Sequence, residues 1–466
     1  MNTTCLLISP GIHCLDHPER FTTTYDFPRG LLSVGTFVNK NGVKTNIIPL
    51  DYYIKPSQSQ SPSYDKQSIE SQIYSVINDA VKESNPAFIG IGVPYTMLYP
   101  TALKIAEICK KVKPDCVIAL GGPHVSYRDK VCFEDSEYVD IVIRGEGEWT
   151  VLDVIKTILQ KKEFDNVSGI TFKHSSGKVI KNQQRPLGDI KEIPMPDYSL
   201  LPEGFVKNMA VSIVGSRGCA YKCTYCNESL FWGQKVRQFP VEMLFEEIKT
   251  LAEKYGNYAV GLEDSMFNMR SKYFFELCDK LGTIKLHPAF YILSRVDSVT
   301  DDGFAAMKKA GVNNLILGIE NGSQKVLDKM NKKITLPQAI DVCKNAVKNG
   351  LIVDTFWIIG HPGDNPEEAE ITIDAVARFY REGLHQNSEI AMFVPYPGTR
   401  IFEHPEEFGL EILTYDWEKW ARFNSEPVCQ LKDFSREDIM GYWIAANKIA
   451  NEWKRHNAYK KMEVGI

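Results

Sequence analysis

The stretch SIVGSRGCAYKCTYCNESLFWG, residues 212–233, carries the strongest structural signal in this sequence. It places Cys219, Cys223 and Cys226 within eight residues, at the spacing C-x3-C-x2-C. Three thiols cannot all pair as disulfides, and a structural zinc site closes with four ligands. Three thiolates can instead hold three irons of a [4Fe–4S] cluster, whose fourth iron stays open to a small molecule. The spacing favours such a cluster; zinc completed by a remote histidine and a chance group of buried thiols are the alternatives.

Length and composition predict an ordinary globular chain with room for two or three domains. The 466 residues are 44% hydrophobic and 24% charged, which is typical of folded domains. A net charge of −5 gives no electrostatic reason to expect a nucleic-acid partner. No apolar run is long enough for stable membrane insertion. The N-terminal MNTTCLLISPG lacks the basic residues of a signal peptide, so we expect a cytoplasmic protein whose eleven cysteines are mostly reduced.

Residues 1–160 alternate short apolar runs with amphipathic stretches. Strands are predicted at TCLLISP, TNIIPL, FIGIGVP, CVIALGG and YVDIVIRG, with helices such as TALKIAEICKKVKP between them. This alternation predicts an α/β fold, a doubly wound, Rossmann-like parallel sheet covered on both faces. Such a sheet binds ligands at the carboxyl ends of its strands, which here read SPG, VPY, GGPH and RGEGE. Glycines there let the backbone approach a ligand, although any one of these loops could be a simple turn.

Residues 161–207 are predicted to connect two domains. VSGITFKHSSGKVIKN has the pattern of a β-hairpin that turns at Ser175-Ser176-Gly177. DIKEIPMPDYSLLPEG is rich in proline and extended, which is typical of a linker.

A second alternation of strands and helices occupies residues 208–402. Strands are predicted at AVSIVGS, YAVGLED, AFYILSR, NNLILGIE, IVDTFWIIG and SEIAMFV. Six strand–helix units predict a partial (β/α)6 barrel of TIM type, whose active site lies at the carboxyl ends of the strands. The three-cysteine loop follows the first of these strands. Residues 403–466, which end in the helical stretch IMGYWIAANKIANEWKRH, are predicted to form a C-terminal α-rich cap.

The loop GCAYKCTYC (residues 218–226) resembles the signature of radical S-adenosylmethionine (SAM) enzymes, C-x3-C-x-aromatic-C, with Tyr225 at the aromatic position. The resemblance implies that the open iron of a [4Fe–4S] cluster chelates SAM. It also implies that one electron, from an external reductant of flavodoxin or ferredoxin type, cleaves SAM to a 5′-deoxyadenosyl radical. Further segments occur in the order that this family shows, namely GLEDSMF, YILSRVD, LILGIENGSQ, FWIIGHPGDNPEEA and VPYPGTRIFE. The resemblance covers about residues 208–402.

Polar side chains in these segments are candidates for SAM binding. The resemblance implies that Glu263 or Asp264, in the acidic strand-end segment, holds the SAM amino group. It implies that the arginine of the Ser–Arg pair binds the carboxylate, and that the glutamate of GIENG contacts SAM or its ribose. An arginine can bind a carboxylate through two parallel hydrogen bonds, whereas helix capping or a structural role is the alternative for each residue. Asn365 is predicted to cap the helix after the fifth strand. The predicted SAM-binding residues are Tyr225, Glu263, Asp264, Ser294, Arg295 and Glu320.

The first domain resembles the cobalamin-binding (B12-binding) domain found ahead of many radical SAM barrels. The resemblance rests on RGLLSVGTFV, IGVPYTMLYPTALKIAEICKK, VIALGGPHVS, VDIVIRGEGEWT and the linker IKEIPMPDYSLLP. Some cobalamin proteins carry D-x-H-x-x-G after the first strand; neither His13 nor His17 stands in that pattern, so no histidine ligand to cobalt is predicted from it. A domain that kept the fold and lost the cofactor is the alternative. The predicted cobalamin-binding residues are Ser9, Pro10, Gly11, Gly121, Gly122, His124, Gly145, Glu146 and Gly147.

Together the two resemblances imply a cobalamin-dependent radical SAM methyltransferase that methylates an unactivated carbon. Rearrangement or cyclisation without methyl transfer is one alternative, and a non-catalytic iron–sulfur or zinc protein is another. The predicted cofactors are a [4Fe–4S] cluster, SAM and cobalamin; the predicted substrate is a small molecule or peptide, and no catalytic side chain is assigned. Four aromatic residues near predicted strand ends are candidates for a substrate pocket or for core packing: Tyr291, Trp357, Phe393 and Tyr396.

Overall fold

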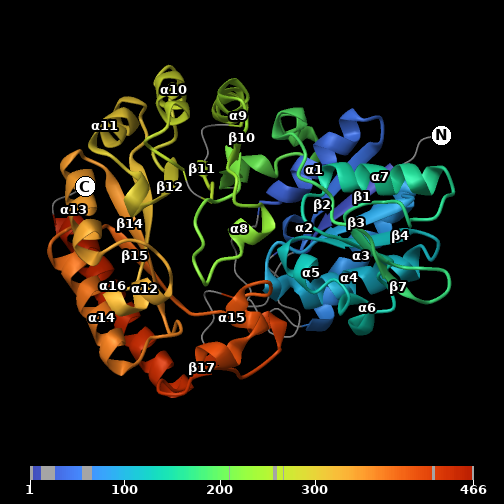
Figure 1. The fold of residues 1–466 in the computed structure, drawn as a ribbon. Helices are drawn as coiled ribbons and strands as arrows, with labels where there is room; N and C mark the ends of the chain where they lie inside the picture. The colour runs from blue at the N-terminus through green and yellow to red at the C-terminus, as the bar shows by residue number, and fades with distance from the viewer. Residues whose placement is uncertain are drawn as a thin grey trace. The chain divides into compact units, whose positions relative to one another are not determined.

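The computed structural model describes residues 4–11, 27–54, 66–208, 210–255, 260–265, 267–421 and 426–463. By its internal contacts the chain divides into two compact units (Figure 1), residues 1–209 with 416–418 and residues 210–415 with 419–466. None of the helices in these described ranges is long and apolar enough to cross a membrane.

The first unit is built on a seven-stranded sheet with the order β2-β1-β3-β4-β5-β6-β7. Strands β1 to β5 are parallel, and β6 pairs antiparallel with both β5 and β7. Every residue of β3 is buried, as expected for an apolar strand in a sheet covered on both faces. The strands are β1 (Thr4–Ser9), β2 (Lys44–Pro49), β3 (Phe88–Gly92), β4 (Val117–Gly121), β5 (Ile141–Ile143), β6 (Ile170–Lys173) and β7 (Val179–Lys181).

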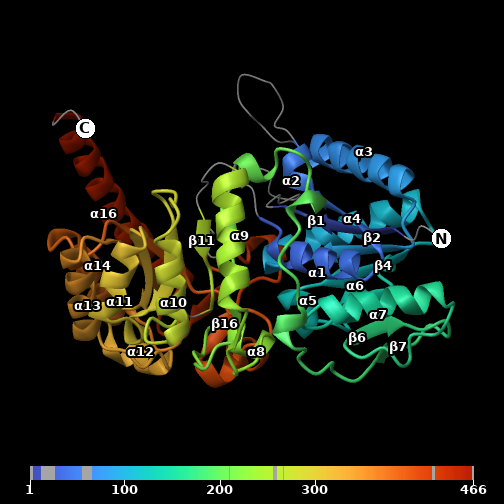
Figure 2. The same ribbon diagram turned by 90° about the horizontal axis from the view of Figure 1, so that it is seen from above.

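Helices cover both faces of this sheet, with α1 and α7 on one side and α3 on the other (Figure 2). α1 packs with α7, and α3 packs with α4. The predicted doubly wound, Rossmann-like α/β fold is therefore confirmed. The helices are α1 (Arg29–Lys40), α2 (Leu50–Tyr53), α3 (Lys66–Ser84), α4 (Tyr99–Val112), α5 (Pro123–Tyr127), α6 (Cys132–Asp135) and α7 (Glu148–Leu159), with a short 3-10 turn η2 (Thr96–Leu98).

The predicted hairpin after α7 belongs to this sheet as well as to the connector. Ile143 on β5 pairs with Ile170 on β6, and Ile141 pairs with Phe172. The pairing covers the backbone edge of β5, which would otherwise offer free hydrogen-bonding groups to another chain. The rest of the connector contains three short 3-10 helices, η3 (Ile190–Glu192), η4 (Tyr198–Leu200) and η5 (Val206–Asn208).

The second unit contains a six-stranded parallel sheet with the order β15-β14-β13-β12-β11-β8. The first and last strands, β8 and β15, each have one neighbour in that order, so the predicted partial barrel is confirmed. The strands are β8 (Val211–Ile213), β11 (Val260–Leu262), β12 (Tyr291–Arg295), β13 (Asn314–Glu320), β14 (Ile352–Ile359) and β15 (Asn387–Met392). The alternating helices are α9 (Val241–Lys254), α10 (Lys272–Leu281), α11 (Asp301–Lys309), α12 (Gln324–Lys329), α13 (Leu336–Lys348) and α14 (Pro366–Arg381), and a 3-10 turn η6 (Val296–Ser298) follows β12.

Capping side chains begin the helices of this barrel. The Asn365 side chain accepts a hydrogen bond from the backbone N–H of Glu368 at 3.0 Å, so the predicted asparagine cap of α14 is confirmed. An N-terminal cap of this kind satisfies a backbone donor that has no partner within the helix. Four other helices begin in the same way on a serine or threonine: Ser271, Thr300, Ser323 and Thr335.

A short strand pair and a C-terminal segment complete the second unit. β9 (Ser216–Arg217) pairs antiparallel with β10 (Arg237–Gln238), and α8 (Glu228–Phe231) lies between them in the sequence. The C-terminal segment holds α15 (Arg400–Glu403), η7 (Pro405–Phe408), an antiparallel pair β16 (Leu410–Ile412) and β17 (Cys429–Leu431), and α16 (Arg436–Glu463). α16 packs against α14 and β15, where the Trp443 indole N–H donates to the Ile390 carbonyl at 2.8 Å.

Candidate functional site

The three-cysteine loop runs between β9 and α8, beyond the carboxyl end of β8. Its start is held tightly, because the Cys219 backbone N–H donates to the Gly233 carbonyl at 3.1 Å. Gly218 has a φ of 103°, and a Cβ there would lie 2.3 Å from the Lys235 carbonyl oxygen. Only glycine fits this crossing of the loop and its return strand.

The three thiols are free, with Cys219 buried and Cys223 and Cys226 half-buried. Burial raises the pKa of the Cys226 thiol to about 12, so bound cationic metal is needed to hold it as a thiolate.

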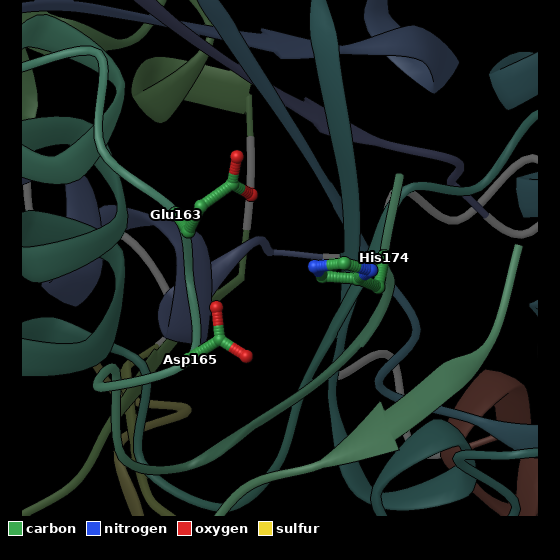
Figure 3. Close-up of side chains that lie close together, drawn as sticks. All are labelled: Glu163, Asp165 and His174. Carbon is green, nitrogen blue, oxygen red and sulfur yellow. The ribbon is translucent and has the colours of Figure 1, made fainter. Parts of the chain in front are cut away.

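The spacing of the sulfur atoms tests the zinc alternative. Among described residues, one group of three or more potential metal ligands has its ligand atoms within 4.8 Å of one another. It consists of Glu163, Asp165 and His174 in the first unit, whose two carboxylates and imidazole face one another in Figure 3. The three cysteine sulfurs are not such a group, so they do not all lie within 4.8 Å of one another. A set of three thiols suits a cluster with one open iron better than a structural zinc site, which takes four ligands.

The loop is anchored to the segment that follows α12. The Thr224 backbone N–H donates to the Met330 carbonyl at 3.0 Å, and the Asn331 side chain donates to the Lys222 carbonyl at 2.8 Å. Because the loop contributes only backbone groups to both contacts, they position the cysteines whatever side chains the loop carries.

Arg295, at the end of β12, lies against this loop. Its Nη1 donates to the Cys223 sulfur at 3.4 Å, and its guanidinium lies 3.6 Å from the centre of the Tyr221 ring. Asp297 accepts from Nε at 2.9 Å and from Nη2 at 3.2 Å, and Nη2 also donates to the Lys332 carbonyl at 2.5 Å. The predicted SAM ligand is thus already engaged by the protein.

Tyr225, Glu320 and Lys332 form a second buried group beside the cysteines. Lys332 Nζ lies 2.7 Å from Glu320 Oε1, and their side chains are 4% and 10% exposed. The Tyr225 hydroxyl donates to the same Oε1 at 3.0 Å. Burial, followed by the charge of Glu320, raises the pKa of Tyr225 well above its usual value, so the phenol keeps its proton and remains a donor.

Glu320 has an unusual backbone as well. Its φ of 74° is left-handed, and the strand register shifts between Gly318 and Glu320. A non-glycine residue in this conformation is strained and persists only where its surroundings hold it. Here the buried ion pair with Lys332, which the sequence did not single out, provides that support.

The other predicted SAM residues lie at neighbouring strand ends. Asp264 is buried and accepts from the Gly215 N–H at 2.5 Å and the Ser216 hydroxyl at 2.6 Å. Glu263 accepts from the Tyr291 hydroxyl. Ser294 is buried and donates to the Phe267 carbonyl at 2.7 Å. Asp264 and Ser294 therefore organise the loops around them.

His361, in the GHPGD segment after β14, is a further buried residue at this site that was not predicted from the sequence. Its Nδ1 lies 2.9 Å from the Pro362 carbonyl, which can only accept. Nε2 is therefore the acceptor that faces the Thr224 hydroxyl at 3.0 Å. Burial lowers the pKa of His361 to about 3, so the ring is neutral. Its ring also meets Tyr225 edge to face, with centroids 6.2 Å apart.

One aromatic candidate for a substrate pocket is a core residue. Trp357 is fully buried, its ring meets Phe379 at 5.2 Å, and its N–H donates to the Thr355 hydroxyl at 2.8 Å.

In the first unit, the predicted cobalamin residues follow parallel strands whose ends share one edge of the sheet. The register pairs Gly92 of β3 with Gly121 of β4, and Gly121 with Ile143 of β5. A Cβ on Gly121 would meet nothing closer than 3.8 Å, so this position leaves room for an approaching group. Gly122 differs, because a Cβ there would lie 2.3 Å from the Val93 carbonyl oxygen. Glycine is therefore needed at position 122 for the packing of the protein backbone, whether or not a ligand binds.

The remaining loops at this edge are tied to one another. The Gly145 backbone N–H, at a φ of 74°, donates to the Ser126 hydroxyl at 3.0 Å. Glu146 is buried, and a Cβ on Gly147 would press on Val34 at 2.9 Å. On the far side of β3, Ser9 is buried, Pro10 follows it, and Gly11 has a φ of 73°.

His124 offers one polar atom that the protein does not satisfy. Its Nδ1 lies 3.3 Å from the Thr96 hydroxyl, whereas Nε2 is buried and has no hydrogen-bond partner among the described residues. Burial lowers the pKa of His124 to about 3, so the ring is neutral. Its ring contacts Tyr99 and Trp417, with centroids 4.5 Å and 5.0 Å away. A bound group that reached this buried nitrogen would supply its missing hydrogen-bond partner. His13 and His17 lie outside the described residues.

Comparison with known proteins gives matches to both halves of the chain. The model of the radical SAM superfamily matches residues 213–376, and that of the B12 binding domain matches residues 24–155. The chain is 31% identical over 374 residues to an uncharacterized methyltransferase, PH0819, of Pyrococcus horikoshii, which covers 79% of this chain and 80% of that protein.

Two further similarities extend the comparison. The chain is 26% identical to an anaerobic magnesium-protoporphyrin IX monomethyl ester cyclase of Rubrivivax gelatinosus, over 74% of this chain and 62% of that protein. The structure of the radical SAM methyltransferase TsrM from Kitasatospora setae, with cobalamin and a [4Fe–4S] cluster bound, aligns with a TM-score of 0.69 at 15% identity. That alignment covers 95% of this chain and 84% of the other, and it concerns the fold alone.

Proposed function

This chain belongs to the radical SAM superfamily and carries a B12-binding domain, and we propose that it is a methyltransferase that acts on an unactivated carbon. Its cofactors are a [4Fe–4S] cluster, SAM and cobalamin. Bound together, these groups supply radical chemistry and a methyl donor, while the protein supplies binding and orientation. The observation that carries the proposal is the three-cysteine loop at the carboxyl end of β8, in a chain with a cobalamin-type first domain.

The chain's own residues suit these tasks. Cys219, Cys223 and Cys226 hold three irons of the cluster through their thiolates, which leaves the fourth iron without a protein ligand. The SAM neighbourhood consists of strand-end and loop residues that surround this position. We assign to it Tyr225, Glu263, Asp264, Ser294 and Glu320; the first and last of these meet in one hydrogen bond beside the cysteines.

Cobalamin is proposed to lie at the glycine-rich edge of the first sheet. Gly121 leaves space there, and His124 presents an unsatisfied nitrogen. The loops that complete the edge contain Ser9, Pro10, Gly11, Gly122, Gly145, Glu146 and Gly147. We accordingly propose residues 1–160 as the cobalamin-binding domain, 161–207 as hairpin and linker, 208–402 as the radical SAM barrel, and 403–466 as the C-terminal cap.

The partners follow from this chemistry. Members of the superfamily act on small-molecule substrates and need a reductant. We propose a one-electron donor of flavodoxin or ferredoxin type. We also propose a cytoplasmic location, which the ten free cysteines of the described residues support.

Reconstitution with iron, sulfide and cobalamin tests the proposal. With SAM and a reductant, the protein should form 5′-deoxyadenosine, and candidate substrates should gain one methyl unit by mass spectrometry. Cys219→Ala should lose both products, whereas Cys343→Ala, at a buried cysteine in α13, should keep them. Failure to form 5′-deoxyadenosine with a fully loaded cluster would contradict the enzyme assignment.

Cyclisation or rearrangement is the second candidate function, because one relative is a cyclase. It predicts a product whose mass carries no added methyl unit while 5′-deoxyadenosine still forms. Isotope-labelled SAM distinguishes the two, since only methyl transfer moves the label into the product.

A further inference from the structure

We propose that Arg295 is a positioning residue for the iron–sulfur cluster, whose guanidinium donates to the Cys223 sulfur and raises the reduction potential of the cluster. The sequence resemblance had assigned this arginine to the SAM carboxylate. The structure points to the cysteine loop, 72 residues away in the sequence.

The hydrogen-bond inventory of the guanidinium carries this assignment. Arginine has five N–H donors. Two are given to the Asp297 carboxylate, one to the Lys332 carbonyl and one to the Cys223 sulfur. One N–H donor on Nη1 remains, so a bidentate pair of hydrogen bonds to a SAM carboxylate would require breaking an existing contact.

The guanidinium is also held in place by two neighbouring side chains, Asp297 and Tyr221. Asp297 accepts two hydrogen bonds from the planar guanidinium. The guanidinium carbon lies 3.6 Å from the centre of the Tyr221 ring, within the range of cation–π contacts. The Arg295 side chain is 7% exposed. A cation that is buried and fixed in this way keeps its N–H aimed at one sulfur.

The effect on the cluster follows from electrostatics. Reduction adds one negative charge to the cluster and its thiolates, and hydrogen bonds to the sulfurs are among the factors that set the potential. A buried positive charge that donates to a ligand sulfur stabilises the reduced form more than the oxidised form. Arg295 therefore makes the cluster easier to reduce by the external donor.

The test is a redox titration of reconstituted Arg295→Gln, Arg295→Lys and wild-type protein, followed by the EPR signal of the reduced cluster. Iron and sulfide content should match in all three. The midpoint potential should fall in Arg295→Gln and fall less in Arg295→Lys, which keeps the charge without the fork. Arg270→Gln, at an exposed arginine of the same unit, is the matched control and should leave the potential unchanged.

SAM affinity, measured by equilibrium dialysis on the same proteins, separates the two roles. We expect Arg295→Gln to bind SAM within about threefold of wild type. An unchanged potential in Arg295→Gln would overturn the proposal, and a tenfold or greater loss of SAM affinity alongside it would assign the residue to SAM instead. No substrate or cobalamin is needed, so failure of methyl transfer would leave this result untouched.

A measurement on unmutated protein keeps the proposal testable if the variants fail to load iron. Protein grown with 15N-arginine is reduced without SAM, and pulsed EPR then detects nitrogen nuclei coupled to the cluster. A 15N coupling that is absent from unlabelled protein supports the Arg295–Cys223 hydrogen bond. Its absence would show that no arginine nitrogen contacts a cluster ligand.

Discussion

Replacing Lys332 with methionine should destabilise the second unit strongly, because it leaves the Glu320 carboxylate buried without its cation. The pair is 2.7 Å apart with side chains 4% and 10% exposed. Removing one partner of such a buried pair costs about 3–5 kcal/mol of unfolding free energy. That is a large share of the roughly 5–15 kcal/mol that holds a typical domain.

Lys325→Met provides a matched control, since Lys325 pairs with Glu368 at 2.9 Å but its side chain is 58% exposed. Surface pairs of this kind contribute little, so the control should unfold close to wild type. The double variant Glu320→Gln with Lys332→Met should recover much of the loss, because a neutral amide oxygen can still accept from the Tyr225 hydroxyl.

The measurement is urea unfolding read by hydrogen-exchange mass spectrometry, peptide by peptide, because two units need not unfold together. Peptides from β13 and α12 should lose protection at lower urea in Lys332→Met than in the control. Equal midpoints for the two lysine variants would refute the reasoning. So would a double variant no more stable than Lys332→Met alone.

Three further predictions follow from local geometry. Asn365→Ala should cost about 1 kcal/mol through loss of the α14 cap, and Asn365→Ser should restore most of it in urea unfolding. Burial raises the pKa of Asp364 to about 7, so the native state binds more protons than the unfolded state between about pH 4 and 7. The free energy of unfolding should therefore fall as pH rises through that range. Asp364→Asn should flatten this pH dependence, and an unchanged slope in the variant would contradict the prediction. Gly122→Ala should weaken cobalamin binding and the thermal stability of the first unit, because its Cβ would lie 2.3 Å from the Val93 oxygen; Gly177→Ala, which meets no atom within 4 Å, should be milder in both assays.

The sequence alone determined the class of fold and the cofactors. Alternation of apolar runs and amphipathic stretches repeats at short range, so it predicted the parallel sheets of both units. The spacing of Cys219, Cys223 and Cys226 is likewise a local property of the chain, and it identified the cluster loop. Asn365 was predictable as a cap for the same reason, since a cap acts within its own helical turn.

Contacts between distant segments were decided only by the tertiary structure. Arg295 was predicted to bind SAM from the family resemblance and from its place at a strand end; its contact with Cys223 requires two loops to meet. Neither Lys332 nor His361 was singled out from the sequence, although both contact the cysteine loop once β13, β14 and that loop are assembled. A local pattern specifies what a segment becomes, whereas the partner of a buried charge depends on which segments the packed core brings together.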